Sequence, residues 1–143
     1  MLNAMLTKLL EIPGLTIMYD QVMDYLSLKW NGSRKSEEFR EAGKEIIKAI
    51  RKTNAKFILS DNTDWKMISP NDHGWAAFNW FPAAEVAGIK KLASVVSKDY
   101  FNRLAESSIE GMADVECMEI RNFGTPQEAL KWLTQSKNHQ PCK

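Results

Sequence analysis

The sequence predicts a single α/β domain built on a mixed β-sheet. Short β-type runs alternate with segments of helical periodicity along the 143 residues, in the order β-β-α-β-α-β-α-β-α. That order gives about five strands covered by about four helices. Strands that alternate with helices form parallel pairs, whereas the first two strands are joined by a short link and should form an antiparallel hairpin. An apolar fraction of 44% is enough for one sizeable core.

Residues 15–19 and 25–30 are the two strands of the predicted hairpin. The first run is rich in β-forming residues and ends at an Asp-Gln turn. The second run alternates apolar and polar side chains until an Asn-Gly pair stops it.

The segment before the hairpin is harder to assign. Leucines and methionines in residues 1–14 fall at helical spacing and stop at a Pro-Gly pair. We expect a helix or a loose arm there, with an extra edge strand as the alternative. The domain itself is expected over residues 15–135, and the polar residues 136–143 are expected to form a flexible tail.

Residues 36–52 form the clearest predicted helix. Apolar side chains recur along it as one stripe, which predicts that one face packs on the sheet. Ser36 is the expected N-cap. Two glutamates follow in the first turn and two basic residues lie in the last turn, so the charges match the helix dipole.

A second helix is predicted to begin with Ser69 as its N-cap and a proline in the first helical position. Pro82 is expected to bend or restart this helix, and Gly88 to cap its C-terminus. The helix follows a short buried strand at residues 57–60 and a polar loop at residues 61–64. That loop would lie at the carboxyl end of the strand.

The remaining elements are two strands and two helices. Residues 90–96 and 115–123 are β-type runs, and Ser97 is the expected cap of the helix between them. Residues 125–128 read Thr-Pro-Gln-Glu, which is a capping box with proline at the first helical position. They predict the start of the final helix.

The element order and several local motifs together resemble the SpoIIAA-like, or STAS-like, domain family. Within it, the chain resembles a small bacterial branch described as STAS and CRAL-TRIO-like, over about residues 15–133. The motifs that carry the resemblance are Trp30-Asn31-Gly32, Asp61-Asn62, Ile68-Ser69-Pro70-Asn71-Asp72, Trp75, Trp80-Phe81-Pro82, Ala87-Gly88-Ile89-Lys90-Lys91, Lys98-Asp99-Tyr100-Phe101 and Ala129-Leu130-Lys131-Trp132-Leu133.

The resemblance implies a fold more than an activity, because one fold hosts many functions. Anti-sigma-factor antagonists of this family carry a phosphorylatable serine after an Asp-Ser-Ser-Gly-type turn. The corresponding stretch here is residues 61–64, Asp-Asn-Thr-Asp, and Ser69 comes later at the helix start. This departure argues against a phosphorylation switch.

Charge and cysteine content exclude several classes of partner and site. The net charge of +1 is made of interspersed acids and bases, which does not fit a nucleic-acid-binding surface. No run approaches the roughly 20 apolar residues of a transmembrane helix. With Cys117 in an apolar run and Cys142 in the polar tail, we expect a buried free thiol, no structural disulfide and a cytoplasmic protein.

No catalytic constellation, metal signature or cofactor motif is predicted. Asp61, Asp64, Asp72 and His73 are the nearest approach to an acid–base or metal cluster, but one histidine and scattered acids lack a metal-binding spacing. Loop and capping roles explain such acids more simply.

The dense aromatic set, Trp65 to Phe81, has two interpretations. It can line an apolar pocket or a partner-binding surface, where tryptophan is common. Core packing beneath a helix is the plainer interpretation for most of the set. The candidate ligand- or partner-binding residues are Asp61, Asn62, Trp65, Ser69, Asp72, His73, Trp75 and Trp80.

Three functions follow, in order of preference. The first is a non-enzymatic binding or regulatory module that binds a protein partner or forms a homodimer. The second is a carrier of a small apolar ligand or lipid, which needs a pocket of at least ~300 Å³ between the second helix and the sheet. The third is an enzyme in which Asp61, Asp72 and His73 converge in one cleft.

Overall fold

A computed structural model describes residues 6–32, 35–65, 70–99 and 113–135 of the chain. These residues form an α/β structure around one six-stranded mixed sheet in which the strand order in space equals the order along the chain. Strands β1, β2 and β3 pair antiparallel, and β3, β4, β5 and β6 pair parallel. The strands are β1 (Leu6–Ile12), β2 (Leu15–Asp20), β3 (Tyr25–Gly32), β4 (Phe57–Trp65), β5 (Lys91–Val95) and β6 (Glu119–Phe123).

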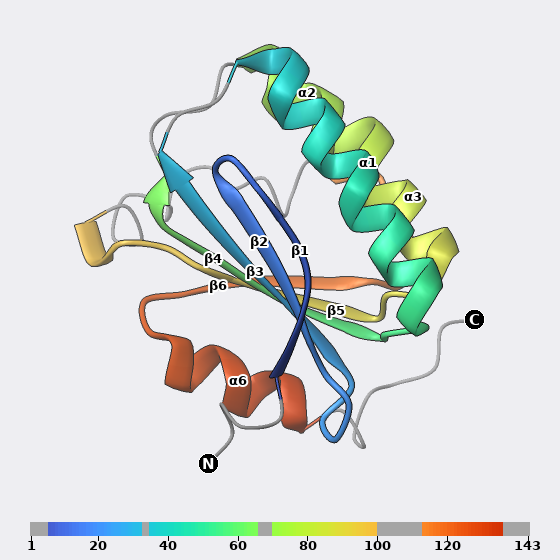
Figure 1. Ribbon diagram of the computed structural model, residues 1–143, viewed down its shortest axis with the longest axis vertical. Coiled ribbons are helices and arrows are strands. Elements are labelled where there is room, and N and C mark those ends of the chain that lie inside the picture. The colour runs from blue at the N-terminus through green and yellow to red at the C-terminus, as the bar shows by residue number, and fades with distance from the viewer. Residues whose placement is uncertain (1–5, 33–34, 66–69, 100–112, 136–143) are drawn as a thin grey trace.

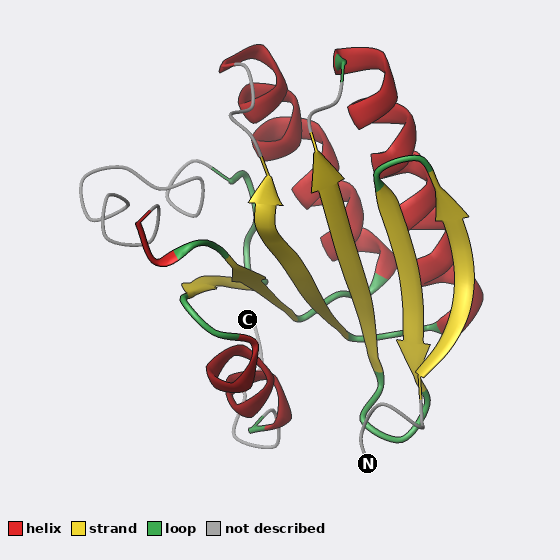
Figure 2. Ribbon diagram, turned by 60° about the vertical axis from the view of Figure 1, so that its left-hand side comes forward, coloured by secondary structure: helices red, strands yellow, loops and turns green. Residues whose placement is uncertain are grey.

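Helices lie on both faces of this sheet. One face carries α1 (Ser36–Thr53) beside a continuous helical rod made of α2 (Pro70–Trp75), the π-helix η2 (Ala76–Trp80) and α3 (Phe81–Ala87). The opposite face carries α6 (Pro126–Thr134), which Figure 2 shows apart from the other helices. Two apolar clusters result, a large one under α1 and the rod and a smaller one under α6.

The N-terminal segment is an edge strand rather than the expected helix or loose arm. Leu6–Ile12 pairs with β2 along its length, with a β-bulge near Leu9. Leu9 and Leu10 pack against the larger cluster and Leu6 against the smaller one. The leucines of this strand therefore pack on both faces of the sheet. Their spacing along the sequence also fits a helix for that reason. The sheet has six strands, one more than expected.

Strand β4 is longer than predicted, and the prediction of a polar loop at residues 61–64 is wrong. The strand continues to Trp65 and pairs with β3 as far as Gly32. The ammonium of Lys29 on β3 lies 3.0 Å from Asp61 Oδ2 and 3.7 Å from Asp64 Oδ2. These ion pairs keep both acids beside the neighbouring strand, so the polar residues extend the ladder instead of leaving it.

Strand β6 is shorter than predicted, because it begins at Glu119 rather than near residue 115. The carboxylate of Glu85 on α3 accepts the backbone N–H groups of Glu116, Cys117 and Met118 at 2.7–3.0 Å. These three donors are therefore bonded to a helix side chain and do not extend the β5–β6 ladder.

Cys117 also corrects an expectation. It is disulfide-bonded and half-buried, and it lies outside any strand. The prediction of a free thiol in a buried strand was therefore wrong. The other cysteine of the chain, Cys142, lies outside the described residues. Spacing along the sequence gave no sign of a bond, because it does not report which segments meet in space.

The second helix continues through Pro82 by widening just before it. The N–H of Phe81 donates to the carbonyl of Ala76, five residues back, which is the π-helical pattern. Proline cannot donate to the carbonyl four residues before it, and the wider turn accommodates this loss. Gly88 ends the rod in the left-handed conformation (φ 117°), as predicted.

Helix α6 begins as predicted from the capping box. Thr125 Oγ1 accepts the N–H of Glu128 at 3.2 Å and donates to its carboxylate at 3.1 Å. Ala129 and Leu133 are buried under the helix. Most of the helix expected after Ser97 lies outside the described residues, as does the expected cap Ser69.

Candidate functional site

A chain of buried polar side chains crosses three neighbouring strands near their carboxyl ends. The indole N–H of Trp30 donates to Ser60 Oγ at 3.1 Å, and Ser60 donates to Asn62 Oδ1 at 2.8 Å. The amide of Asn62 then donates to Ser94 Oγ at 2.7 Å. The carboxyl end of a parallel sheet is where α/β folds bind ligands, so these four side chains lie where a ligand site is expected.

The polar chain is better explained as a structural device. One bond joins β3 to β4, one lies within β4 and one joins β4 to β5, and the four side chains retain at most 9% exposure. Ser60 accepts one hydrogen bond and donates another, and Asn62 uses both its carbonyl and its amide group. Buried groups satisfied in this way fix strand register and leave little hydrogen-bonding capacity for a ligand.

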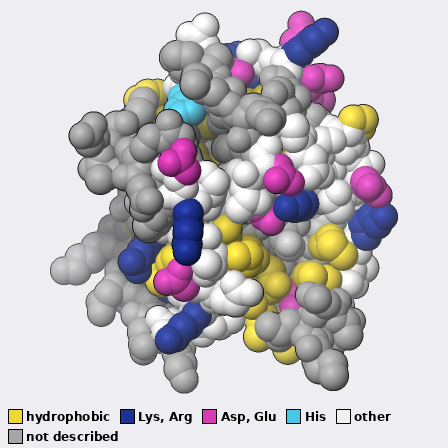
Figure 3. All heavy atoms as spheres, turned by 90° about the vertical axis from the view of Figure 1, so that its left-hand side faces the viewer, with side chains coloured by type: hydrophobic (Ala, Val, Ile, Leu, Met, Phe, Trp, Pro, Cys, Tyr) yellow, Lys and Arg dark blue, Asp and Glu magenta, His cyan; other side chains and the backbone are white. Residues whose placement is uncertain are grey.

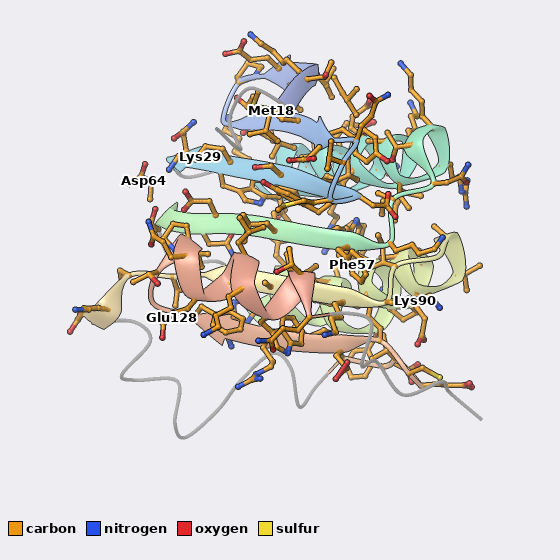
Figure 4. The ribbon with its side chains drawn as sticks, turned by 90° about the horizontal axis from the view of Figure 1, so that it is seen from below. Met18, Lys29, Phe57, Asp64, Lys90 and Glu128 are labelled. Atoms are coloured by element: carbon orange, nitrogen blue, oxygen red, sulfur yellow. The ribbon has the colours of Figure 1, made fainter. Side chains whose placement is uncertain are left out.

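Asp61 projects from the opposite face of β4. Its neighbours along the strand both bond on the α1 side, and side chains alternate along a strand. Asp61 contacts Lys29 and Thr63 there. Burial raises its pKa, but hydrogen bonds from Thr63 and Lys29 outweigh burial and lower the pKa below 3.8. Figure 4 shows Lys29 beside Asp64, with Phe57 at the other end of β4.

Asp72 belongs to a different setting, between α2 and α1. It is buried, its Oδ2 accepts the hydroxyl of Ser36 at 2.9 Å, and its Oδ1 lies 3.4 Å from Arg40 Nε. Ser36 therefore ties two helices together and does not cap its own helix as predicted; Glu38 Oε1 instead accepts the N–H of Lys35.

The acid–base cluster of the enzyme hypothesis is divided between these two settings. Asp61 bonds to residues of β3 and β4, whereas Asp72 bonds to α1 from the first turn of α2. His73 follows Asp72 and is half-buried. Across the described ranges, no group of three or more His, Cys, Asp or Glu residues is arranged to hold a metal ion.

The two tryptophans of the rod face α1. Trp80 is 9% exposed, and its indole N–H donates to the carbonyl of Gly43 at 2.8 Å. Trp75 is half-buried, packs edge-on against Phe39 with ring centroids 5.9 Å apart, and lies under the guanidinium of Arg40. Both indoles thus hold two helices together, as the core-packing interpretation expects.

The rings also occupy the space where an apolar carrier would need its pocket. Trp30, Phe39 and Trp80 are buried between the sheet and the helices, and Trp80 packs edge-on against Phe81 at 5.1 Å. Trp30 and Phe39 are 5.9 Å apart. Close ring packing of this kind is typical of a filled core.

The outer side of the rod shows what the sequence did not reveal. Phe78 is 58% exposed and Val86 is 85% exposed, and half-buried Pro82 lies midway between them. We call these three residues the outer apolar face. The sequence pattern places Phe78 with the core aromatics and does not mark Val86, because helical periodicity cannot be read across a π-helical turn as if it were α-helical.

The outer apolar face lacks charge. Between Gly74 and Ile89 the only charged residue is Glu85, and its carboxylate is occupied by three backbone N–H groups. By contrast, Figure 3 shows acidic and basic side chains interspersed on the side of the molecule toward which β3 and β4 end.

Comparisons with known proteins leave this geometry as the main guide. No protein-family model matches the chain, and no curated protein matches it. Of the candidate residues, Ser69 and the side chain of Trp65 lie outside what the structure describes. Within the described residues, no helix is both long and apolar enough to span a membrane.

Proposed function

We propose that this protein is a non-enzymatic binding module that recognises another protein through the outer apolar face of Phe78, Pro82 and Val86. The observation that carries the proposal is the exposure of two large apolar side chains, 58% and 85%, on the part of the rod from Gly74 onward, where the single charged residue, Glu85, is already bonded. Contiguous exposed apolar surface marks interaction sites in soluble proteins.

The interior of the rod supports this role because it makes the outer face rigid. Trp80 is bonded to Gly43, and Asp72 is bonded to Ser36, so the rod is fixed to α1 at two points. A partner that covers the outer face would not have to order a mobile helix first. Preorganisation of this kind lowers the entropic cost of binding.

The resemblance to the STAS-like family is compatible with this proposal. The observed structure and the fold that the resemblance implies both have helices packed on a mixed sheet. One such fold can carry many different binding functions. On its sequence motifs, we also propose that the chain is a STAS-like domain that lacks the phosphorylation switch, because residues 61–64 read Asp-Asn-Thr-Asp.

A cytoplasmic location is also part of the proposal, although one observation opposes it. Cys117 is disulfide-bonded, and disulfides persist mainly in oxidising compartments. Thiol alkylation of the protein at the moment of cell lysis, followed by mass measurement, decides the question. A protein with two alkylated cysteines supports a reducing compartment. A protein with no alkylated cysteine argues against one.

The test of the proposed function uses two exposed positions. A photo-activated cross-linking amino acid is placed at Phe78 or, as the matched control, at Val22, which is 68% exposed on the β2–β3 hairpin. Irradiation in the native cells should give a discrete protein adduct from Phe78 and none from Val22. Equal adduct yields, or none from either position, overturn the proposal.

A further inference from the structure

The two cysteines of the chain are Cys117 and Cys142. Cys117 is disulfide-bonded, and no described cysteine is free. A bond within one chain leaves Cys142 as the partner of Cys117, although Cys142 itself lies outside the described residues. Such a bond requires the fold to bring the segment before β6 close to the end of α6.

The described contacts place these two ends near each other. Lys91 is the first residue of β5 and pairs in register with Glu119, the first residue of β6. The ammonium of Lys91 donates to the carbonyl of Trp132 at 3.3 Å and lies 4.7 Å from the centre of its ring. The last turn of α6 therefore lies over the starts of β5 and β6, and Cys117 comes two residues before β6. The seven residues from 136 to 142 can span about 25 Å, which is enough for the bond.

A bond between residues 117 and 142 closes a covalent loop that contains all of β6 and α6. β6 lies at an edge of the sheet and pairs with β5 alone among the described strands, and α6 covers the face opposite α1 (Figure 2). Few buried side chains hold this β6–α6 unit in place: Ile120 on β6, and Ala129 and Leu133 on α6. A unit with so little buried contact gains much of its attachment from a covalent bond.

We propose that a Cys117–Cys142 disulfide is a redox-sensitive clasp that holds the β6–α6 unit on the sheet. A dithiol reductant opens the clasp. One of its thiolates attacks a sulfur of the disulfide, and the other cysteine leaves as a thiolate that takes up a proton. The second thiol of the reductant then releases the first cysteine, so the protein ends with two thiols and the reductant with a disulfide. A disulfide oxidant closes the clasp by the reverse exchange.

The effect of opening the clasp should be local. Reduction lets β6 and α6 leave the sheet transiently, which uncovers the smaller apolar cluster that includes Tyr25 and Phe57. The helices of the opposite face are tied to each other by the Trp80–Gly43 hydrogen bond, which the clasp does not touch. The inference goes beyond the proposed function and does not depend on it, because the outer apolar face belongs to that opposite set of helices.

Hydrogen exchange of the full chain, followed by mass spectrometry, tests the clasp. The protein is compared after equilibration with oxidised glutathione and after reduction with dithiothreitol. Digestion of the oxidised form without reductant should give a linked peptide pair that contains both cysteines. In the reduced form the amides of β6 and α6 should exchange about 100-fold faster, which is the scale of stabilisation that a closed loop of this length provides. The amides of α1 should exchange at an unchanged rate.

Two variants of the C-terminal segment separate the bond from other effects of the reductant. Cys142→Ser should show the reduced pattern with and without dithiothreitol. Gln140→Ala, the matched control, keeps both cysteines and should respond to dithiothreitol as the natural protein does. Absence of the linked peptide pair overturns the inference. So does equal exchange of β6 and α6 in the two redox forms, or an acceleration that extends equally to α1.

Discussion

Trp80 and Gly43 join the helical rod to α1 at a point where no side chain fits between them. The indole N–H donates to the Gly43 carbonyl at 2.8 Å. A Cβ at Gly43 would lie 2.9 Å from Trp80 Cδ1 and 2.9 Å from Trp75 Cη2, closer than real Cβ contacts allow. Glycine is therefore required here by the approach of two rings and not by backbone conformation.

The first prediction follows from this contact. Gly43→Ala should lower the free energy of unfolding by about 1–3 kcal/mol, because overpacking between rigid rings outweighs the gain in helix propensity of about 1 kcal/mol. Gly74→Ala is the matched control, since a Cβ there meets nothing within 4 Å. It should be neutral or stabilising. Urea unfolding of both variants gives the comparison, and equal effects would contradict the proposed contact.

The second prediction concerns the buried polar chain. Asn62→Ala removes the acceptor of Ser60 and the donor to Ser94 at once, which should cost about 2–3 kcal/mol because two buried hydroxyls lose partners. Thr63→Ala, the next residue on the less buried side of β4, should cost under about 1 kcal/mol. Chemical denaturation measures both. A mild effect at Asn62 would mean that water replaces the lost bonds.

Much of the fold could be predicted because local chemistry and global structure agree. The capping box at Thr125 and the C-terminal glycine at Gly88 specify helix ends whatever surrounds them. The apolar stripe of α1 identified its buried face, including Phe39 and Ile46. Such signals depend on neighbours in the chain, which a sequence displays directly.

The errors occurred where distant residues decide the local structure. β4 extends because Lys29 pairs with acids on the next strand, and β6 shortens because Glu85 binds the backbone before it. The exposure of Phe78 has a local cause instead: it lies in the π-helical turn before Pro82, where α-helical spacing does not apply. Lys29 and Glu85 each lie 32 residues from a group that they bind, which is too far to form a motif.

The third prediction concerns a buried acid. Asp20 is fully buried; its Oδ1 accepts the N–H groups of Val22 and Met23 at 2.9 Å, and Oδ2 has no hydrogen-bond partner within the described part of the chain. Asp20→Asn keeps the accepting oxygen and removes a buried charge, so stability at pH 7 should rise by about 1 kcal/mol. Asp20→Ala loses both bonds and should cost about 2 kcal/mol.

Tyr25 provides an independent readout of the same substitution. Burial raises the pKa of Tyr25, and the nearby charge of Asp20 raises it further. Asp20→Asn should therefore lower that pKa toward 10.0, as ultraviolet titration of the tyrosines would show. If Asp20→Asn destabilises the protein as much as Asp20→Ala does, the unpartnered oxygen carries a role that the described contacts do not reveal.

The fourth prediction is a pH dependence caused by Glu85. Burial raises the pKa of Glu85, but hydrogen bonds from the N–H groups of Glu116, Cys117 and Met118 outweigh burial and lower it below 4.5. A carboxylate whose pKa is lower in the folded than in the unfolded protein stabilises the folded state above pH 4.5. This contribution is lost as the pH falls through the folded-state pKa. Glu85→Gln should therefore be less stable than the natural protein by about 1 kcal/mol at pH 7, since the group is half-exposed.

The stability difference between the natural protein and Glu85→Gln should shrink below pH 4.5 and vanish once Glu85 is protonated, because a neutral acid and an amide then accept the same N–H groups about equally. Glu116→Gln is the control, because it removes an acid from the same segment while its exposed side chain is not part of the carboxylate contact. Urea unfolding at steps from pH 7 to pH 3 measures both differences. A difference for Glu85→Gln that stays constant over this range would show that the 116–118 segment is held by packing and not by the ionised carboxylate.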